Sequence, residues 1–192
     1  MTVHTMSVSA TKTKKVIEHL RQHGGQGKGW YHAHQDPRPL DEQTRASLTL
    51  PDGRPLPPSL HAWLAFDASW FGLMTDTPPR RLKLAPLKDL LRAQARAMTN
   101  SPHGQEVPAE ESFSDEQMVQ VWVGLLPHPA MAEALAVELP PSGSQQHFFV
   151  FHQAGPEGEY PIVGFASAFE FWVKYPDFGA YLSHYFGLSK PD

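Results

Sequence analysis

Residues 56–73 read LPPSLHAWLAFDASWFGL and contain a strong helix-start signal. Proline has a fixed φ and no amide proton to lose, so the two prolines suit a helix entrance. The hydroxyl of Ser59 can accept a hydrogen bond from an amide of the first turn. The apolar residues then recur at spacings of three and four, which places Leu60, Trp63 and Leu64 on one face, with Phe66 near its edge. The pattern predicts a short docking helix over residues 59–66.

The loop after this helix, residues 67–72, carries two further aromatic side chains, Trp70 and Phe71. Large rings beyond a helix end either wedge into the core or form part of a binding surface. The sequence leaves both interpretations open. Together with Asp67, these rings are candidate contacts to a partner.

The chain has 192 residues and no cysteine. Its length suffices for one domain that buries roughly 70% of the surface of the unfolded chain. The lack of cysteine excludes disulfides, thiol catalysis and cysteine-bound zinc, and it is typical of a reducing compartment. Residues 1–15 lack the apolar core of a secretion signal, and no run of about 18 apolar residues could span a bilayer. We therefore expect a cytoplasmic protein with no membrane contact.

Opposite charges are concentrated in opposite halves of the sequence. Residues 1–96 contain 14 Lys and Arg against 8 Asp and Glu, whereas residues 97–192 contain 2 against 12. Segregated charge of this kind usually reflects the partners of a protein. The alternative is that folding interleaves the two halves and evens out the surface charge.

Three further helices are predicted from apolar stripes and their flanking residues. Residues 14–23 contain the stripe Val16, Ile17 and Leu20 and end at a pair of glycines. Proline opens the predicted helices 86–98 and 177–186. We expect little regular structure in the remaining segments, which are a flexible N-terminus at 1–10, a loop at 26–55 with a short strand at 46–50, and a mobile polar insertion at 99–115.

Short apolar or alternating runs follow in the second half of the chain, separated by Pro, Gly and Ser. Such runs are typical of successive antiparallel strands. The predicted meander comprises residues 118–126, 134–139, 147–152 and 161–165, with 169–175 as an additional strand. Leu82 and Leu84 also alternate as in a strand. Because helices mainly precede clustered strands, the order predicts an α+β fold, a single domain with a mainly antiparallel or mixed central sheet flanked by helices.

The sequence contains no complete catalytic or cofactor motif. The glycine-rich residues 24–30 lack the spacing of a phosphate loop, and a helix cap that leads into a loop explains them better. His32, His34 and Asp36 could contribute to a metal site, but no further strong ligand follows at a readable spacing. We therefore expect no enzymatic activity, no cofactor and no metal. A metal-dependent hydrolase that uses these three residues is the alternative.

Aromatic side chains stand beside carboxylates in the acidic second half of the chain. Protein-recognition surfaces favour aromatic anchors, and complementary charge accelerates association. On a strand only alternate side chains face outward, so we assign about half of these rings to the core. The carboxylates selected as candidate partner contacts are Glu157, Glu159, Glu170 and Asp177.

Three segments of the chain resemble the SUKH superfamily, the Smi/Knr-like immunity fold. The resemblance rests on the amphipathic helix in residues 12–24, on the proline-led LPPSLHAWLAF helix in 56–73, and on YPIVGFASAFEFWVKYPDFGAYLSHYF within 147–187. Members of this family commonly follow the second motif with a loop of the Asn-Gly-Gly type, whereas this chain has DASW at residues 67–70. Contacts made by that loop therefore cannot be transferred.

The resemblance implies a cytoplasmic α+β binding protein, often an immunity protein that neutralises a bacterial toxin by direct contact, with no catalytic residues. Related folds serve as scaffolds in cell-wall regulation, and fold alone does not give function, so a regulatory scaffold is the alternative. If the acidic excess gathers on one face, its partner is a basic protein such as a nuclease toxin, and nucleic acid itself is repelled. The oligomeric state stays open.

Overall fold

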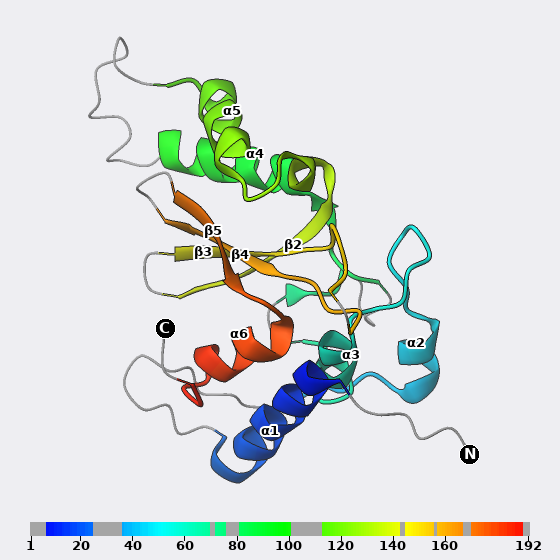
Figure 1. The fold of residues 1–192 in the computed structure, drawn as a ribbon. Helices are drawn as coiled ribbons and strands as arrows, with labels where there is room; N and C mark the ends of the chain where they lie inside the picture. Colours follow the sequence, from blue (N-terminus) through cyan, green and yellow to red (C-terminus); the bar gives the residue numbers. More distant parts are fainter. Residues whose placement is uncertain are drawn as a thin grey trace. The chain divides into compact units, whose positions relative to one another are not determined.

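Two compact units make up the chain, and each contains segments that are distant in the sequence. Unit 1 comprises Met1–Lys83, Gln153–Ile162 and Lys174–Asp192, and unit 2 comprises Leu84–His152 and Val163–Val173. The computed structural model describes residues 7–24, 36–69, 72–75, 81–100, 113–142, 145–155, 157–166 and 170–189. Figure 1 shows the helices and strands of both units.

Unit 1 is built around the helix predicted from the LPPSLHAWLAF stretch. This helix, α3, spans Pro58–Leu64, has proline in its first turn and buries its apolar face completely. The ring of Trp63 packs against those of Phe66, Phe178 and Phe186, with centroid distances of 5.5, 6.5 and 5.9 Å. The predicted docking helix is therefore confirmed, and its tryptophan lies at the centre of an aromatic cluster.

Two further helices of unit 1 pack against α3 and against each other. They are α1 (Val8–His23) and α6 (Phe178–Tyr185), and Figure 1 shows both beside α3. Gly24 ends α1 with a hydrogen bond from its amide to the carbonyl oxygen of Leu20. This is the helix end predicted from the pair of glycines.

The first turns of α1 correct the prediction of a flexible N-terminus at residues 1–10. The helix already begins at Val8, because the hydroxyl of Ser7 accepts the amide proton of Ala10 at 3.0 Å. Ser9 and Thr13 are buried, so these turns pack through small polar side chains. A search for apolar stripes does not detect such a surface. Residues 1–6 lie outside the described part of the chain.

The close packing of α1 on α6 requires glycine at position 179. A Cβ atom there would lie 2.5 Å from the carbonyl oxygen of Ser9 and 2.9 Å from its Oγ. The two helices would have to separate, so we expect Gly179→Ala to lower the free energy of unfolding by about 1–3 kcal/mol. Urea unfolding measures this change.

Gly124 is the matched control, because it lies within another helix, α5 (Asp115–Leu125), and a Cβ atom there meets nothing within 4 Å. Alanine is the better helix former, so Gly124→Ala should raise the free energy of unfolding by about 0.5–1 kcal/mol. Equal urea midpoints for the two variants would contradict the close approach of α1 and α6.

A five-stranded antiparallel sheet lies mainly in unit 2, with its strands in the order β1-β2-β3-β4-β5. In the central pair, Val137 of β2 lies opposite Phe149 of β3, and β1 adds a two-residue pairing at the edge of β2. Four predicted strands are confirmed: 134–139, 147–152, 161–165 and 169–175. The observed strands are β1 (Ala85–Pro86), β2 (Leu135–Ser142), β3 (Gln145–Val150), β4 (Ile162–Ala166) and β5 (Glu170–Tyr175).

Helices of unit 2 bury one core with this sheet. The helix α4 (Leu87–Thr99), α5 and the 3-10 helix η3 (Pro129–Glu133) share a cluster that includes Trp122, Phe148 and Phe165. The predicted helices at 86–98 and 177–186 are confirmed with ends shifted by one residue. The α+β class is therefore confirmed. Within the described ranges, no helix has the length and apolar character needed to cross a bilayer.

Residues 118–126, which were predicted as a strand, lie almost entirely in α5, so this prediction is wrong. Ser114 and Gln117 form a capping box at the start of the helix, with hydrogen bonds of 2.9 and 3.2 Å. Val119 is buried whereas Val121 is 41% exposed, although a strand would place both on one face. Apolar residues on both sides of the helix concealed its period in the sequence.

The region predicted as mostly loop contains a short helix. α2 spans Glu42–Ser47, and the side chain of Asp41 caps it by accepting the amide proton of Thr44 at 2.8 Å. The helix replaces the start of the strand predicted at 46–50. The strand expected around Leu82 is reduced to an isolated bridge with Met74.

Helices bound the polar insertion predicted at residues 99–115. Thr99 ends α4 and Asp115 begins α5, and the hydroxyl of Thr99 donates a hydrogen bond of 2.8 Å to Oδ1 of Asp115. Residues 101–112 lie outside the described part of the chain. The prediction is therefore wrong at its ends and stays a prediction for its centre.

Candidate functional site

Two carboxylates selected from the sequence lie at the starts of helices in unit 1 that are distant from them in the sequence. Oε2 of Glu157 accepts the amide proton of Val8 at 2.8 Å, at the start of α1. Glu159 accepts the amide proton of Ser59 at 2.8 Å and its hydroxyl proton at 2.5 Å, at the start of α3. The first amides of a helix lack partners within it and carry partial positive charge, so both carboxylates occupy stabilising positions.

Asp177 is the N-cap of α6 and also connects this helix to α1. Its Oδ1 accepts the amide proton of Ala180 and the hydroxyl proton of Ser9, each at 2.7 Å. Its Oδ2 lies 3.6 Å from Nζ of Lys12. Asp177 and Glu159 are only 9% and 6% exposed. Both carboxylates hold unit 1 together, which revises their selection as surface contacts for a partner.

Burial controls the protonation of Glu159. Desolvation raises the pKa of its carboxyl above the ordinary value of 4.5, and the hydrogen bonds from Ser59 partly oppose this effect. The nearby charges of Asp177 and Glu157 raise the pKa further. The folded protein therefore binds a proton at Glu159 more readily than the unfolded chain does.

This difference predicts a pH-dependent stability. Because the pKa of Glu159 is raised on folding, its contribution to stability is fully present below pH 4.5 and is lost as the pH rises through the folded pKa. Glu159→Gln removes the titration and keeps an oxygen that can accept from the amide of Ser59. We expect the stability of this variant relative to wild type to increase with pH. Urea midpoints at about pH 4, 6 and 8 measure the difference, and a constant difference would contradict it.

Asp67 is fully buried and shapes the loop after α3. Its Oδ1 accepts the amide proton of Arg38 at 3.1 Å, the amide proton of Ser69 at 2.8 Å and the hydroxyl proton of Ser69 at 2.7 Å. The amide of Ala68 donates to the carbonyl oxygen of Arg38 at 2.8 Å. These bonds join the loop to the segment that precedes α2. Asp67 is therefore a structural residue, and its selection as a partner contact is also revised.

Several residues selected from the sequence fall outside the described part of the chain. They are Trp70, Phe71, His32, His34 and the side chain of Glu170. Asp36 is described, is exposed and has a left-handed φ of 50°. Among the described residues, no group of three or more His, Cys, Asp or Glu could hold a metal ion. The metal site and the aromatic contacts stay predictions.

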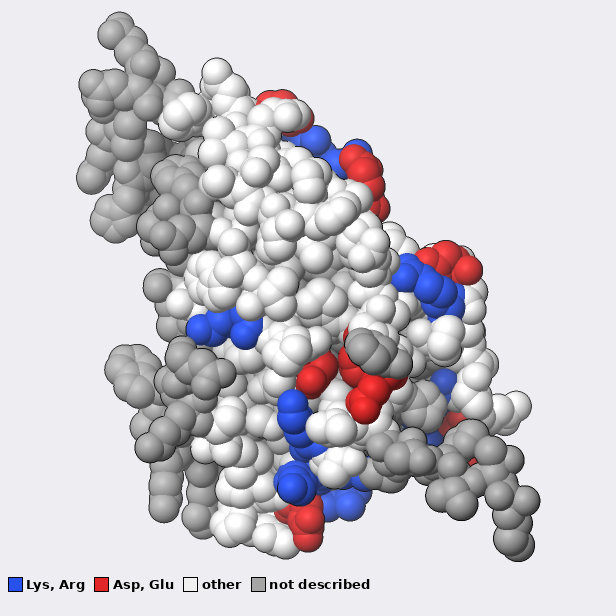
Figure 2. All heavy atoms as spheres, viewed as in Figure 1, with Lys and Arg blue, Asp and Glu red and all other residues white. Residues whose placement is uncertain are grey.

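Folding interleaves the charges of the two sequence halves in unit 1. Glu157, Glu159 and Asp177 come from the acidic half, and they bind the starts of α1 and α3 in the basic half. Figure 2 shows acidic and basic side chains beside one another in small groups. At these helix starts, folding therefore brings the acidic and basic halves of the sequence together, as the alternative interpretation of the charge asymmetry predicts.

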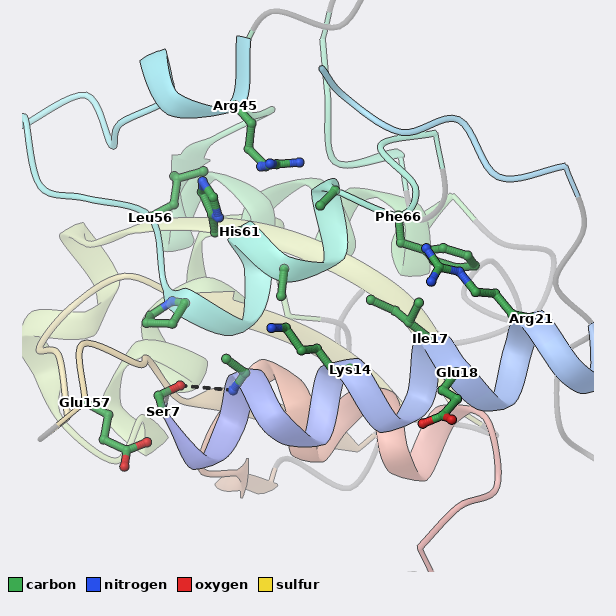
Figure 3. Close-up of a pocket in the computed structure, with 14 residues that line it drawn as sticks. Ser7, Lys14, Ile17, Glu18, Arg21, Arg45, Leu56, His61, Phe66 and Glu157 are labelled. Carbon is green, nitrogen blue, oxygen red and sulfur yellow. Dashed lines mark hydrogen bonds between the residues drawn. The ribbon is translucent and has the colours of Figure 1, made fainter. Parts of the chain in front are cut away.

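An open groove of about 1200 Å³ runs over α1 and α3 in unit 1. Figure 3 shows Lys14 between the two helices, with Arg21 and Phe66 at one end and Ser7 and Glu157 at the other. The apolar part of the groove is formed by Ala10, Ile17, Leu56, Ala62, Ala65 and Phe66. The small alanine side chains leave space above the line where the helices meet.

Charged side chains surround this apolar part. Lys14, Glu18 and Arg21 share one face of α1 because they are spaced three, four and seven residues apart. Arg45 of α2 and His61 of α3 line the same groove. Desolvation, together with the charge of Arg45, lowers the pKa of His61 below 6.5, so its ring is mainly neutral near pH 7.

Reasoning from the sequence did not identify the groove. Ser7, Ala10, Lys14, Ile17 and Arg21 recur at spacings of three and four, which is a readable helical face. The face was missed because the predicted helix began at residue 14. The contribution of Arg45 depends on α2, which was not predicted.

The sequence matches no protein-family model and no curated protein. In structure, the chain is similar to an uncharacterized protein from Salmonella enterica subsp. enterica serovar typhimurium str. 14028s, which is known from a crystal structure. The two chains share 16% sequence identity with a TM-score of 0.53, over 94% of this chain and 78% of the Salmonella chain. At this identity the similarity shows a shared fold alone. The resemblance to the SUKH superfamily stays a prediction.

Proposed function

We propose that the chain is a non-enzymatic binding protein that recognises another protein along the groove over α1 and α3. The observation that supports this most is the composition of the groove, in which Ile17, Ala62 and Ala65 lie between charged residues. Protein interfaces typically combine an apolar centre with a polar rim. A small-molecule site would instead enclose most of its ligand and direct a few polar groups toward it.

The family resemblance makes the proposed role more specific. Two of the segments that resemble the SUKH superfamily, residues 12–24 and 56–73, contain most of α1 and all of α3 and therefore supply the floor of the groove. The proposed role is an immunity protein that neutralises a bacterial toxin in the cytoplasm by direct contact. A regulatory scaffold of the same fold is the second candidate, and it would bind several partners more weakly than the roughly nanomolar affinity expected for a toxin.

Two of the four carboxylates that were proposed to contact a basic toxin are buried. Glu159 and Asp177 are buried in hydrogen bonds within unit 1. Glu157 is exposed, but one of its oxygens accepts the amide proton of Val8. A basic toxin, such as a nuclease, therefore stays a proposal that depends on Glu157 and Glu170.

A growth assay tests the proposed function. The product of the adjacent gene is induced as the toxin candidate in cells that contain or lack this chain. We expect the wild-type chain to restore growth and to co-purify with the toxin. Ala65 is exposed within the groove, and Ala65→Trp fills the space that the partner would occupy. We expect this variant to bind about 30-fold more weakly, which corresponds to the loss of about 2 kcal/mol at an interface hot spot.

Ala97→Trp is the matched control, because Ala97 is exposed on α4 and does not line the groove. This variant should protect cells as well as the wild type does. If the folded wild-type chain neither binds the toxin candidate nor restores growth, the proposed function is wrong. If both tryptophan variants bind equally well, binding takes place elsewhere.

A further inference from the structure

Two arginines that line the groove lack an acidic partner in the described part of the chain. Neither Arg21 nor Arg45 has a carboxylate within ion-pair distance there. Three other cations of the described residues do form short pairs: Arg54, Lys88 and Arg92 lie 2.6, 2.7 and 2.7 Å from their carboxylates. The groove therefore presents positive charge to whatever occupies it.

The other charges of the groove do not cancel this excess. Lys14, which Figure 3 shows between α1 and α3, is a third cation of the lining. Glu18 lies on the same face of α1, and Glu157 lies at the start of that helix, where it accepts the amide proton of Val8. The lining contains three Lys and Arg against two carboxylates, one of which is engaged at a helix start.

Contacts with neighbouring residues hold the two arginines in place. The guanidinium of Arg21 lies 5.5 Å from the centroid of the Phe66 ring, and Phe66 is itself buried. A cation above an aromatic face is attracted to it, which orders the arginine without neutralising its charge. Arg45 is held from α2, where its Nη1 lies 3.5 Å from the carbonyl oxygen of Leu40.

The shape of the groove fits a helix. Its floor includes Ala10 of α1, Ala62 of α3 and Ala65 just after α3, and these small side chains let a third helix approach closely at those positions. From Ser7 to Arg21, α1 extends over roughly 21 Å, the length of about 14 helical residues. None of the residues that line the groove belongs to a strand, so a partner strand has no sheet edge to pair with there.

We propose that the groove binds an amphipathic helix of the partner whose apolar ridge is flanked by Asp and Glu side chains. The apolar ridge covers the alanines and Ile17, and the carboxylates pair with Arg21 and Arg45. This inference rests on the proposed function, because it names the chemistry of the partner at the same groove. The acidic half of the sequence had predicted an acidic contact surface and a basic partner, whereas this inference gives a basic contact surface and an acidic partner helix.

Two model peptides test the inference without knowledge of the toxin. One is a helical peptide of about 14 residues made of Leu and Glu, and its twin has Lys in place of every Glu. Each is titrated into the isotope-labelled chain at physiological salt, and the backbone amide shifts are followed by NMR. We expect the Glu peptide to bind with a Kd of roughly 0.1–1 mM and the Lys peptide to bind at least about tenfold more weakly. The shifts should centre on residues 10–21 and 58–66.

Charge reversal identifies the side chains responsible. Arg21→Glu/Arg45→Glu should weaken binding of the Glu peptide by about tenfold or more. Lys15→Glu/Arg96→Glu makes the same change in net charge at exposed residues outside the groove and should leave this affinity unchanged.

Equal binding of the two peptides, no binding of the Glu peptide at millimolar concentration, or shifts outside the groove would overturn the inference. The growth assay separates its failure from that of the proposed function. If the chain protects against the toxin but does not bind the Glu peptide, the proposed function stands and the inference of an acidic partner helix is wrong. If the chain binds the Glu peptide in the groove but does not protect against the toxin, the inference of an acidic partner helix stands and the proposed function is wrong.

Discussion

Replacing Trp63 by alanine is expected to lower the free energy of unfolding of this protein by about 3–5 kcal/mol. The side chain is fully buried and, among the described residues, packs against the rings of Phe66 after α3 and of Phe178 and Phe186 at the two ends of α6. Its removal loses this burial and leaves a cavity that the surrounding helices can fill only in part. Urea unfolding followed by circular dichroism measures the change.

Trp63→Phe is the control for this prediction. Phenylalanine keeps an aromatic ring against Phe66, Phe178 and Phe186 and leaves a smaller cavity, so it should cost clearly less than alanine. If Trp63→Ala costs less than about 1 kcal/mol, the stretch of residues 56–73 does not organise unit 1 as described.

Replacing Glu159 by alanine is expected to be nearly as damaging. Glu159 accepts both the amide and the hydroxyl protons of Ser59, and Ser59 is fully buried. Alanine leaves both donors without this acceptor at the start of α3, at a cost of about 1–3 kcal/mol for each. The same urea experiment measures the loss at about pH 7.

Glu159→Gln separates the hydrogen bonds from the charge. The amide oxygen of glutamine can accept from the amide of Ser59, and its NH₂ group can donate to the hydroxyl. This variant should retain most of the stability that alanine loses. An alanine variant as stable as the glutamine variant would show that these bonds contribute little to the fold.

The helices and strands that were predicted correctly have a clear apolar pattern and a clear boundary. α3 follows two prolines, α1 ends at Gly24, and β3 is a short apolar run between polar segments. Local steric preferences and the apolar pattern determine such elements, so a single sequence contains the necessary information.

The errors occurred where the side chains do not distinguish the possible structures. α5 carries valines on both its buried and its exposed sides, so its apolar pattern also fits a strand, and only the capping box of Ser114 and Gln117 favours the helix. The first turns of α1 bury Ser9 and Thr13, which look like exposed residues in the sequence. The apolar pattern alone is therefore insufficient for α5, and the burial of Ser9 and Thr13 in α1 depends on tertiary contacts.

The candidate site depended on pairings across long sequence distances. Glu159 was selected because it is acidic and lies beside an aromatic residue, but its partner Ser59 is 100 positions away. The groove likewise combines α1, α3 and Arg45 of α2, and no local motif connects them. The sequence therefore predicts the helices that form the floor of the groove but not the site itself.

Hydrogen exchange of the chain, alone and in complex with the adjacent-gene toxin, tests the central claim that partners bind in the groove over α1 and α3. We expect slower exchange of backbone amides in residues 8–21 and 58–66 when the toxin is bound, and little change in α4 and α5. Slower exchange confined to α4, α5 or the sheet, with the groove unchanged, would contradict the claim.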